Sequence, residues 1–319
     1  MKLETLSIVC KMAEDKSSKV VELTTGSTLS IEPLFSRSDF IFNKFILRES
    51  IGGSLPDIFV ELRVNEDCCQ LGDVLQFKIV NETGWCNKFD AYIYQLEYVN
   101  TVLSLHLTAC NPEFVRDIHT LTYKGIDESI RGSYKSDIDS NVDTNINQEL
   151  DIYQCNETNY DFLNNIMYGY RKDIIWGYSA GKLVIRDLRN WTEEYKLDRQ
   201  EELHIIDSQK ITDPKKLSYD IEVLEQFTNF TKIKFGKDIV DVDNRYLDLI
   251  ENRVHNSKYG EFKSGYKFKT RFIPPLIICT NVSVYSDETN VENCFVTSRE
   301  ISVHNGVFIC NFNVSSIKP

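Results

Sequence analysis

The stretch Glu149–Leu188, ELDIYQCNETNYDFLNNIMYGYRKDIIWGYSAGKLVIRDL, is the most informative part of the sequence because it predicts a helix followed by a hairpin. Asn156 or Thr158 can cap the helix, since a side-chain oxygen at that position accepts a hydrogen bond from an unpaired N–H of the first turn. Apolar residues then recur at one-, three- and four-residue steps and predict one buried helix face: Phe162, Leu163, Ile166, Met167 and Tyr170.

Two strands are predicted directly after this helix. Ile174–Trp176 and Leu183–Ile185 flank Gly177-Tyr178-Ser179-Ala180-Gly181, a loop whose glycines can adopt the positive φ values of a hairpin turn. The apolar face of the helix is expected to pack on this hairpin, at Trp176 and Ile185. The unit is therefore read as helix, strand, tight turn, strand.

Length and charge limit the classes of protein to consider. The chain has 319 residues, of which 42% are hydrophobic, so two or three globular domains are expected. A net charge of -12 argues against a surface built to grip nucleic acid or anionic lipid. The first residues carry Glu4 and Ser7 where a secretory signal would be apolar, and no run reaches the roughly 18 apolar residues of a membrane helix. A soluble chain without a membrane segment is expected.

The nine cysteines are scattered, and most lie in strand-like apolar runs, which favours buried reduced thiols. Only Cys68 and Cys69 are adjacent. Neighbouring residues of a strand point to opposite faces, so a zinc or disulfide site there lacks partners at a workable spacing.

Residues 1–110 are predicted to form the first β-rich part of the chain. In Asp57–Val64 the apolar residues alternate with other residues, which is the period of a half-buried strand. Further strands are predicted on similar patterns at Thr5–Met12, Val20–Leu23, Phe40–Arg48, Leu71–Val80, Phe89–Val99 and Thr101–Ala109. The pattern is typical of an antiparallel barrel or sandwich.

Residues 111–199 have a mixed character. Phe114, Val115, Ile118 and Leu121 fall at helical spacing, and a second helix is expected near Gly125 with Asp127 as its cap. The polar run Ser136–Asn147 predicts an exposed loop. Acidic and amide residues occupy alternate positions of this run, as in a calcium loop: Asp137, Asp139, Asn141 and Asp143. Val142 and Gln148 replace the glycine and the bidentate glutamate of such loops, which favours a solvated loop over a calcium site.

Residues 200–319 are predicted to be β-rich again, after a polar linker at Arg189–Gln200. Strands are expected at His204–Ile206 and Lys216–Lys234, and a helical insertion at about Asp238–Ser264. The clearest hairpin pairs Phe295–Val303 with Val307–Val314 through His304-Asn305-Gly306. The expected fold class is mainly β with α insertions.

The sequence offers no catalytic constellation. It has no glycine-rich phosphate loop and no metalloprotease motif, and its five histidines share no motif: His106, His119, His204, His255 and His304. No pair of acidic residues has a spacing that singles it out for glycosidase chemistry. We therefore expect no catalytic, metal-binding or cofactor-binding residue, and no enzymatic activity.

The order of these segments resembles the tail hub family of bacteriophages, which includes the hub of contractile-tail baseplates and the hub part of the type VI secretion spike. The likeness covers nearly the whole chain. Its most specific piece matches the polar and aromatic box that precedes the helix of that family: Gln154, Glu157, Thr158, Asp161, Phe162 and Leu163. Leu71–Phe77 and Leu105–Pro112 are supporting pieces.

The resemblance implies that residues 1–110 and 200–319 are two tube-protein-like β-barrel domains, with the mixed segment 111–199 between them. A homotrimer would present six similar barrels and seat a sixfold tail tube on a threefold central spike. Expected partners are then the tube protein, the spike protein and surrounding baseplate proteins, and genomic DNA would pass without specific binding. The expected location is the virion tail, assembled in the host bacterial cytoplasm. Unlike larger members of the family, the sequence ends at Pro319 without a lysozyme or spike part.

Other classes stay open. The chain could be the hub of a related contractile injection system or a phage-derived one, and the sequence does not distinguish contractile, long or short tails. A β-rich host-glycan-binding module is compatible with three Trp and sixteen Tyr, and glycan binding would favour it. A cell-wall hydrolase would show turnover in a zymogram. Rings with a central hole in negative-stain images would distinguish a hub from both.

Overall fold

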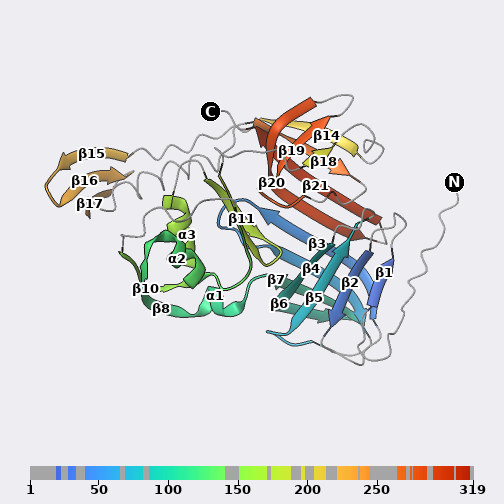
Figure 1. The fold of residues 1–319 in the computed structure, drawn as a ribbon. Helices are drawn as coiled ribbons and strands as arrows, with labels where there is room; N and C mark the ends of the chain where they lie inside the picture. The colour runs from blue at the N-terminus through green and yellow to red at the C-terminus, as the bar shows by residue number, and fades with distance from the viewer. Residues whose placement is uncertain are drawn as a thin grey trace.

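The structure is a computed structural model, and the part of the chain that it describes is mainly β with three short helices (Figure 1). The described residues are 19–22, 28–33, 40–64, 69–81, 86–140, 151–170, 174–187, 195–197, 205–212, 221–235, 238–243, 264–270, 274, 276–285, 290–304 and 307–316. The helices are α1 (Pro112–Arg116), α2 (Gly125–Ser133) and α3 (Asn159–Tyr170). The mainly β fold class predicted from the sequence is confirmed.

Seven described strands before residue 111 make up the first part of the main sheet: β1 (Lys19–Glu22), β2 (Thr28–Pro33), β3 (Phe40–Ser50), β4 (Asp57–Val64), β5 (Val74–Val80), β6 (Cys86–Val99) and β7 (Val102–Thr108). They pair antiparallel in the order β1-β2-β5-β6-β7-β4-β3. In β4 the side chains of Ile58, Val60 and Leu62 are buried and those between them are more exposed, so the predicted period of two is confirmed.

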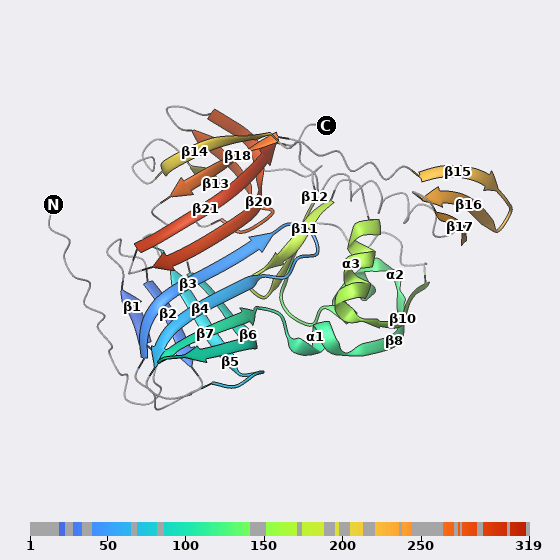
Figure 2. The ribbon, with the colours of Figure 1, turned by 180° about the vertical axis from the view of Figure 1, so that it is seen from behind.

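Six described strands from the later part of the chain extend the same sheet: β13 (Tyr195–Leu197), β14 (Ile205–Thr212), β18 (Ser264–Thr270), β19 (Asn281–Tyr285), β20 (Asn290–His304) and β21 (Val307–Ser316). β20 and β21 form the predicted last hairpin, with His304 opposite Val307. β3 pairs antiparallel with β20, from Lys44 opposite His304 to Ser50 opposite Ser298 (Figure 2). This seam joins the two strand sets, and the order continues β3-β20-β21-β18-β14. β1 and β14 are unjoined ends of this path, so the described strands form an open sheet and no closed barrel.

One apolar core runs along this sheet on both sides of the seam. Phe45 and Phe77 of the first strand set are fully buried in it, and so are Phe268 and Phe308 of the second set. Burial of such large apolar side chains is the main favourable contribution to folding. The two strand sets are therefore stabilised together.

A mixed unit of helices and short strands lies beside the main sheet (Figures 1 and 2). Its strands are β8 (Ile118–Lys124), β9 (Ile138–Ser140), β10 (Asp151–Thr158), β11 (Ile174–Ser179) and β12 (Lys182–Asp187). β8 pairs with β10, and β11 pairs with β12, whose other edge carries β9 in parallel. The predicted order of helix, strand, turn and strand is confirmed by α3, β11 and β12.

A small three-stranded antiparallel sheet is drawn apart from the main sheet in both ribbon views: β15 (Ile221–Gln226), β16 (Phe230–Phe235) and β17 (Asp238–Asp243). The sequence predicted a helical insertion from about Asp238. The start of that insertion is instead a strand, because Asp238–Asp243 pairs along its whole length with β16. The residues with helical spacing, 246–254, lie outside the described residues, as do Thr5–Met12 and the turn residues Asn305 and Gly306.

Two local predictions in the mixed unit are corrected. The helix expected through Ile118 and Leu121 ends at Arg116, and both residues lie in β8, because this segment pairs with β10. Asp127 does not cap α2. The Glu128 carboxylate accepts the backbone N–H of Lys124 at 2.8 Å, and Asp127 pairs with Arg131 one turn later.

The hairpin turn and two polar segments are corrected as well. The turn between β11 and β12 is only Ala180-Gly181, with φ of 44° and 82°, so Gly177 lies within a strand. The predicted loop Ser136–Asn147 contains β9, which pairs with β12. The predicted linker Arg189–Gln200 contains β13, which pairs with β19. Loops were predicted in both places because the segments are polar. Both segments contain a strand because a neighbouring strand supplies partners for their backbone hydrogen bonds.

Candidate functional site

The fully buried side chain of Gln154 organises the start of α3. Its amide oxygen accepts from the Tyr123 hydroxyl at 3.2 Å, and its Nε2 donates to the Glu157 carbonyl at 3.1 Å and to the Asn159 Oδ1 at 3.0 Å. A buried amide is stable only when it is hydrogen-bonded. The first residue of the box therefore fixes the place where β10 ends and α3 begins.

The other polar residues of the box close the first turn of α3. Thr158 Oγ1 accepts the backbone N–H of Asp161 at 3.1 Å and donates to the Asp161 carboxylate at 2.8 Å. Glu157 accepts from the Asn165 amide at 3.2 Å. Of the two predicted capping residues, Thr158 is the one that makes this contact, and Asn156 has a positive φ of 54° at the irregularity in β10. The box is thus a capping and packing motif.

Phe162, Leu163 and Ile166 of α3 lie in one apolar cluster with Trp176 and Ile185 of the hairpin, as predicted. The helix also packs against α1, α2 and β10, and the Phe162 ring stacks on Tyr123 of β8 at a centroid distance of 5.3 Å. The sequence did not show these further partners, because they belong to elements that were predicted less well.

Tyr178 is the centre of an aromatic group in the same cluster. Its ring lies within 5.8–6.2 Å, centroid to centroid, of four others: Phe114, Tyr134, Tyr160 and Trp176. Its hydroxyl donates to Asn164 Oδ1 at 3.1 Å. The predicted turn residue Tyr178 is therefore a fully buried core residue of the mixed unit.

The mixed unit is attached to the main sheet through β11 and the end of β3. The Gly52 N–H donates to the Trp176 carbonyl at 2.7 Å, and Gly52 and Gly177 form an isolated parallel bridge. A Cβ on Gly177 would lie 2.7 Å from Ile278 Cδ1 and 3.0 Å from the Ser50 carbonyl oxygen. Glycine at residue 177 therefore permits the close approach of the two backbones.

A buried ion pair lies at the point where the seam and the mixed unit meet. Glu49 of β3 and Arg299 of β20 are opposite each other, and both side chains are fully buried. Arg299 Nε donates to Glu49 Oε2 at 2.9 Å, and its Nη1 donates to the Leu276 carbonyl. The Ser179 hydroxyl of β11 donates to Glu49 Oε1 at 3.0 Å. The pair therefore links β3, β20, β11 and the segment before β19.

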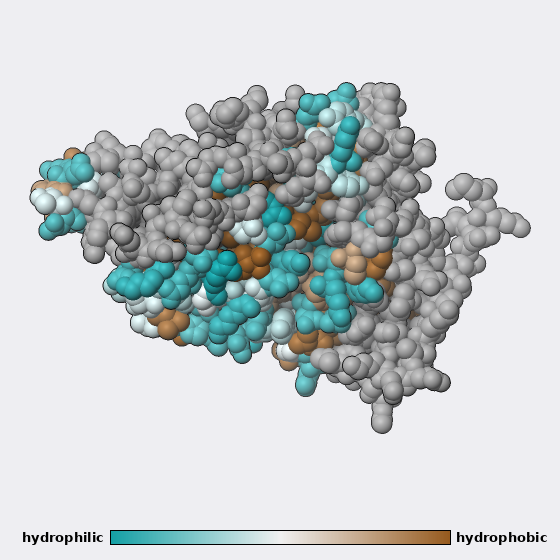
Figure 3. Space-filling model, viewed as in Figure 1, coloured by the Kyte–Doolittle hydropathy of each residue, from teal (hydrophilic) through white to brown (hydrophobic). Residues whose placement is uncertain are grey.

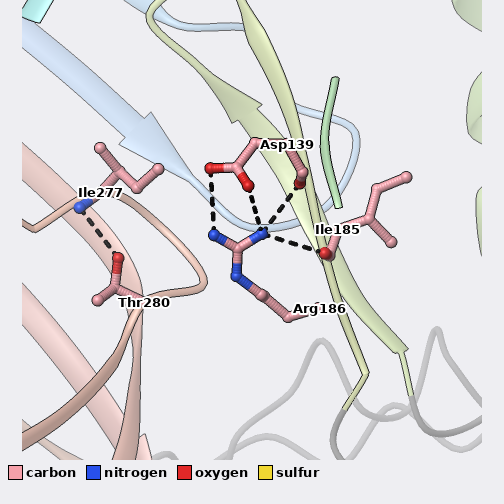
Figure 4. A network of polar contacts seen from close by, with 5 residues as sticks. All are labelled: Asp139, Ile185, Arg186, Ile277 and Thr280. Carbon is pink, nitrogen blue, oxygen red and sulfur yellow. Dashed lines mark hydrogen bonds and ion pairs between the residues drawn. The ribbon is translucent and has the colours of Figure 1, made fainter. Parts of the chain in front are cut away.

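The Arg186 guanidinium binds the carboxylate of Asp139, one of the residues in the calcium-like sequence pattern (Figure 4). Its Nη1 and Nη2 donate to the two Asp139 carboxylate oxygens at 3.0 and 3.1 Å, and Nη1 also reaches the Asp139 carbonyl. A bidentate guanidinium neutralises the carboxylate. This contact supports the preference for a non-calcium reading at Asp139. Asn141 and Asp143 lie outside the described residues.

Burial governs the ionisation of the core thiols. Burial raises the pKa of Cys110 and of Cys310 to about 12, and it raises the pKa of the Tyr134 hydroxyl as well. A reactive cysteine needs the opposite shift, toward the thiolate. Cys110 and Cys310 therefore behave as small core residues, as the sequence predicted for buried thiols.

The histidines stay separate in the described part of the fold. His106 packs against the rings of Phe59 and Tyr94, and His304 lies opposite Lys44 at the seam. His119 lies in β8, and His204 and His255 are outside the described residues. Within the described ranges no group of three or more metal-ligating side chains occurs, and no helix is long and apolar enough to cross a membrane.

The chain is similar to known proteins in its fold, and not in its sequence. No protein-family model and no curated protein sequence matches the chain. Several solved structures match about nine-tenths of it. A tail protein from Neisseria meningitidis MC58 gives a TM-score of 0.62 at 12% identity, covering 91% of this chain and 96% of that protein.

Two further matches are similar in extent. The 43 kDa tail protein of prophage MuSo2 from Shewanella oneidensis gives a TM-score of 0.59 at 11% identity, over 90% of this chain and 97% of that one. The E. coli protein c3393, a type VI secretion component described as similar to the T4 tail proteins gp27 and gp5, gives 0.60 at 9% identity, over 90% and 77%. The chain therefore has the fold of these tail and type VI secretion proteins, as the resemblance predicted.

Sequence reasoning missed the residues at the seam. Glu49 and Arg299 are charged residues that the sequence did not single out, and both are buried. The one local signal is the alternation along each strand: Glu49 follows the buried Phe45 and Leu47 at a spacing of two residues, and Arg299 precedes the buried Ile301 and Val303 in the same way. Their partnership could not be found from sequence, because 250 positions separate them.

Proposed function

We propose that this chain is a structural tail hub of a bacteriophage. It forms a homotrimeric ring that joins the sixfold tail tube to the threefold central spike and lines the conduit for DNA ejection. The observation that carries the proposal is the fold likeness over about nine-tenths of the chain to two proteins described as tail proteins. A hub acts through shape and contacts, so the proposal includes no catalytic, metal-binding or cofactor-binding residue and no enzymatic activity.

We propose the same three parts for the assembled protein: tube-like barrel domains at 1–110 and 200–319, and the mixed unit at 111–199 as decoration. In isolation the described strands form an open sheet. Contacts with neighbouring subunits would then complete each tube-like part. The seam between β3 and β20, with its buried ion pair, supports this model because it holds the two strand sets in one orientation within each subunit.

The proposed partners are the tube protein above, the spike protein below and surrounding baseplate or tail proteins. The proposed location is the virion tail, after assembly in the host bacterial cytoplasm. A net charge of -12 supports passage of DNA without specific binding, since a polyanion is not attracted to an acidic protein.

A hub of a related contractile injection or type VI-like system is the second candidate. The likeness to the E. coli type VI secretion component favours it. Purification from infected or induced cells would separate the two, because a phage hub is recovered in particles that contain DNA.

The trimer is tested by light scattering across a concentration series, with and without the spike protein. Cyclic closure of three chains satisfies every interface, and a partner that binds only the ring stabilises it by mass action. We expect a monomer at low concentration and a trimer at higher concentration or with the spike. A stable dimer or a sixfold ring in both conditions would contradict the proposal.

A further inference from the structure

A polar cavity of about 210 Å³ lies in the mixed unit, between α1, the end of α2 and the start of α3. Phe114, Ser133 and Asn159 form its buried part, and Glu113, Asp117 and Lys135 lie at its exposed rim. On the face seen in Figure 3, most of the described surface is hydrophilic, with small separate apolar patches. No residue that lines the cavity belongs to the seam between β3 and β20.

Asn159 supplies an unused hydrogen-bond donor in this cavity. Its side chain is more than nine-tenths buried, and its Oδ1 accepts from Gln154 at 3.0 Å. Its Nδ2 has no hydrogen-bond partner within the described ranges of the chain. This N–H group is accessible from the cavity, so it can donate a hydrogen bond to a ligand oxygen there.

Ser133 supplies an acceptor beside it. The Ser133 hydroxyl donates its proton to the Ser129 carbonyl at 2.6 Å. Its oxygen lone pairs can therefore only accept a hydrogen bond from a ligand. The buried part of the cavity thus needs a ligand that accepts at one point and donates at another.

The charged groups at the rim also favour a ligand that both donates and accepts hydrogen bonds. The Glu113 and Asp117 carboxylates accept hydrogen bonds, and the Lys135 ammonium donates them. None of the three has an ion-pair partner in the part of the chain that the structure describes. An anionic ligand would face two carboxylates, and a cationic ligand would face Lys135 and the Asn159 donor. A neutral ligand whose groups both donate and accept satisfies all five groups.

We propose that this cavity binds a neutral polyhydroxylated ring, one hexose unit of a glycan. Each sugar hydroxyl both donates and accepts, and a ring edge can pack on Phe114. A volume of about 210 Å³ is smaller than the roughly 300–1,000 Å³ of pockets for drug-sized ligands, so it admits about one ring. The proposal goes beyond the hub function and does not depend on trimer formation.

The test is saturation-transfer NMR on the full chain with glucose, galactose and N-acetylglucosamine at millimolar concentration. We expect transfer from the protein to at least one of these sugars. The double variant Glu113→Gln, Asp117→Asn should weaken binding at least tenfold, because hydrogen bonds to charged groups are the stronger ones. Both residues are exposed, so circular dichroism should show an unchanged fold. Glu97→Gln, an exposed carboxylate on β6 away from the cavity, is the matched control and should bind as wild type.

A steric variant tests the location independently. Ser136→Trp places a ring at the exposed mouth of the cavity without changing its charges, and it should abolish transfer. Absence of transfer to all three sugars in the wild type would overturn the proposal. Unchanged binding in the double variant or in Ser136→Trp would also overturn it. Transfer to acetate or methylammonium, with none to the sugars, would assign a charged ligand instead.

Discussion

Breaking the buried ion pair at the seam should destabilise the protein more than any exposed ion pair can. Arg299→Met removes the N–H donors that reach Glu49 and the Leu276 carbonyl. It leaves Glu49 buried, with the Ser179 hydroxyl as its remaining hydrogen-bond donor in the part of the chain that the structure describes. Loss of one partner of a fully buried pair costs about 3–5 kcal/mol. Glu49→Leu should cost a similar amount. The double variant Glu49→Leu, Arg299→Met should lie near wild type, because two uncharged side chains need no compensation.

The same strands provide a matched control. Arg48 and Glu300 are the next pair along the ladder and are joined at 2.8 Å, but their side chains are 54% and 33% exposed. An exposed pair contributes about 0–1 kcal/mol, so Arg48→Met should change stability little. Urea unfolding of the four variants gives the free energies directly. A cost for Arg299→Met as small as that for Arg48→Met would refute the view that the pair is buried and required.

Three further results are expected. Gly177→Ala should destabilise the protein by about 1–3 kcal/mol, because its Cβ would lie 3.0 Å from the Ser50 carbonyl oxygen and 3.1 Å from Ile51 Cα; an unchanged melting temperature would contradict this close approach. Phe162→Ala should cost about 3–5 kcal/mol, since the ring is 2% exposed and stacked on Tyr123; thermal unfolding measures it, and a wild-type midpoint would mean that the helix face is wrongly assigned. Burial raises the pKa of Cys310 to about 12, whereas an unfolded thiol ionises near about 8.5, so stability should fall as pH rises above about 8.5, by up to about 1.4 kcal/mol per unit. Cys310→Ala should remove that part of the slope in urea unfolding at pH 7 and 10, and an identical slope in the variant would count against a buried thiol.

The sequence predicted the local elements whose burial pattern repeats along one segment. β4 was predicted from its alternation, and α3 with its hairpin from helical spacing and glycines. The pattern of apolar residues reports which face of an element is buried, and that information is local. The predictions failed where the spacing of apolar residues indicates one element and pairing with a distant strand produces another. Ile118 and Leu121 have helical spacing, but pairing with β10 makes them part of a strand.

The box around Gln154 shows an intermediate case. Its residues suggested a helix start, and Thr158 is the cap. The burial of Gln154 depends on the Tyr123 hydroxyl, which lies 31 positions away, and on Asn159. A polar residue reads as exposed until its hydrogen-bond partners are known.

The strand order and the contacts between distant segments came only from the tertiary structure. Alternation specifies that β3 and β20 each bury one face, but it does not specify that they pair, and so it could not bring Glu49 to Arg299. The cavity is likewise assembled from residues near 113, 133 and 159 that share no motif. The physical reason is that hydrophobic burial is non-directional: it decides from sequence which residues leave water, whereas the choice of partner depends on the packing of the whole chain.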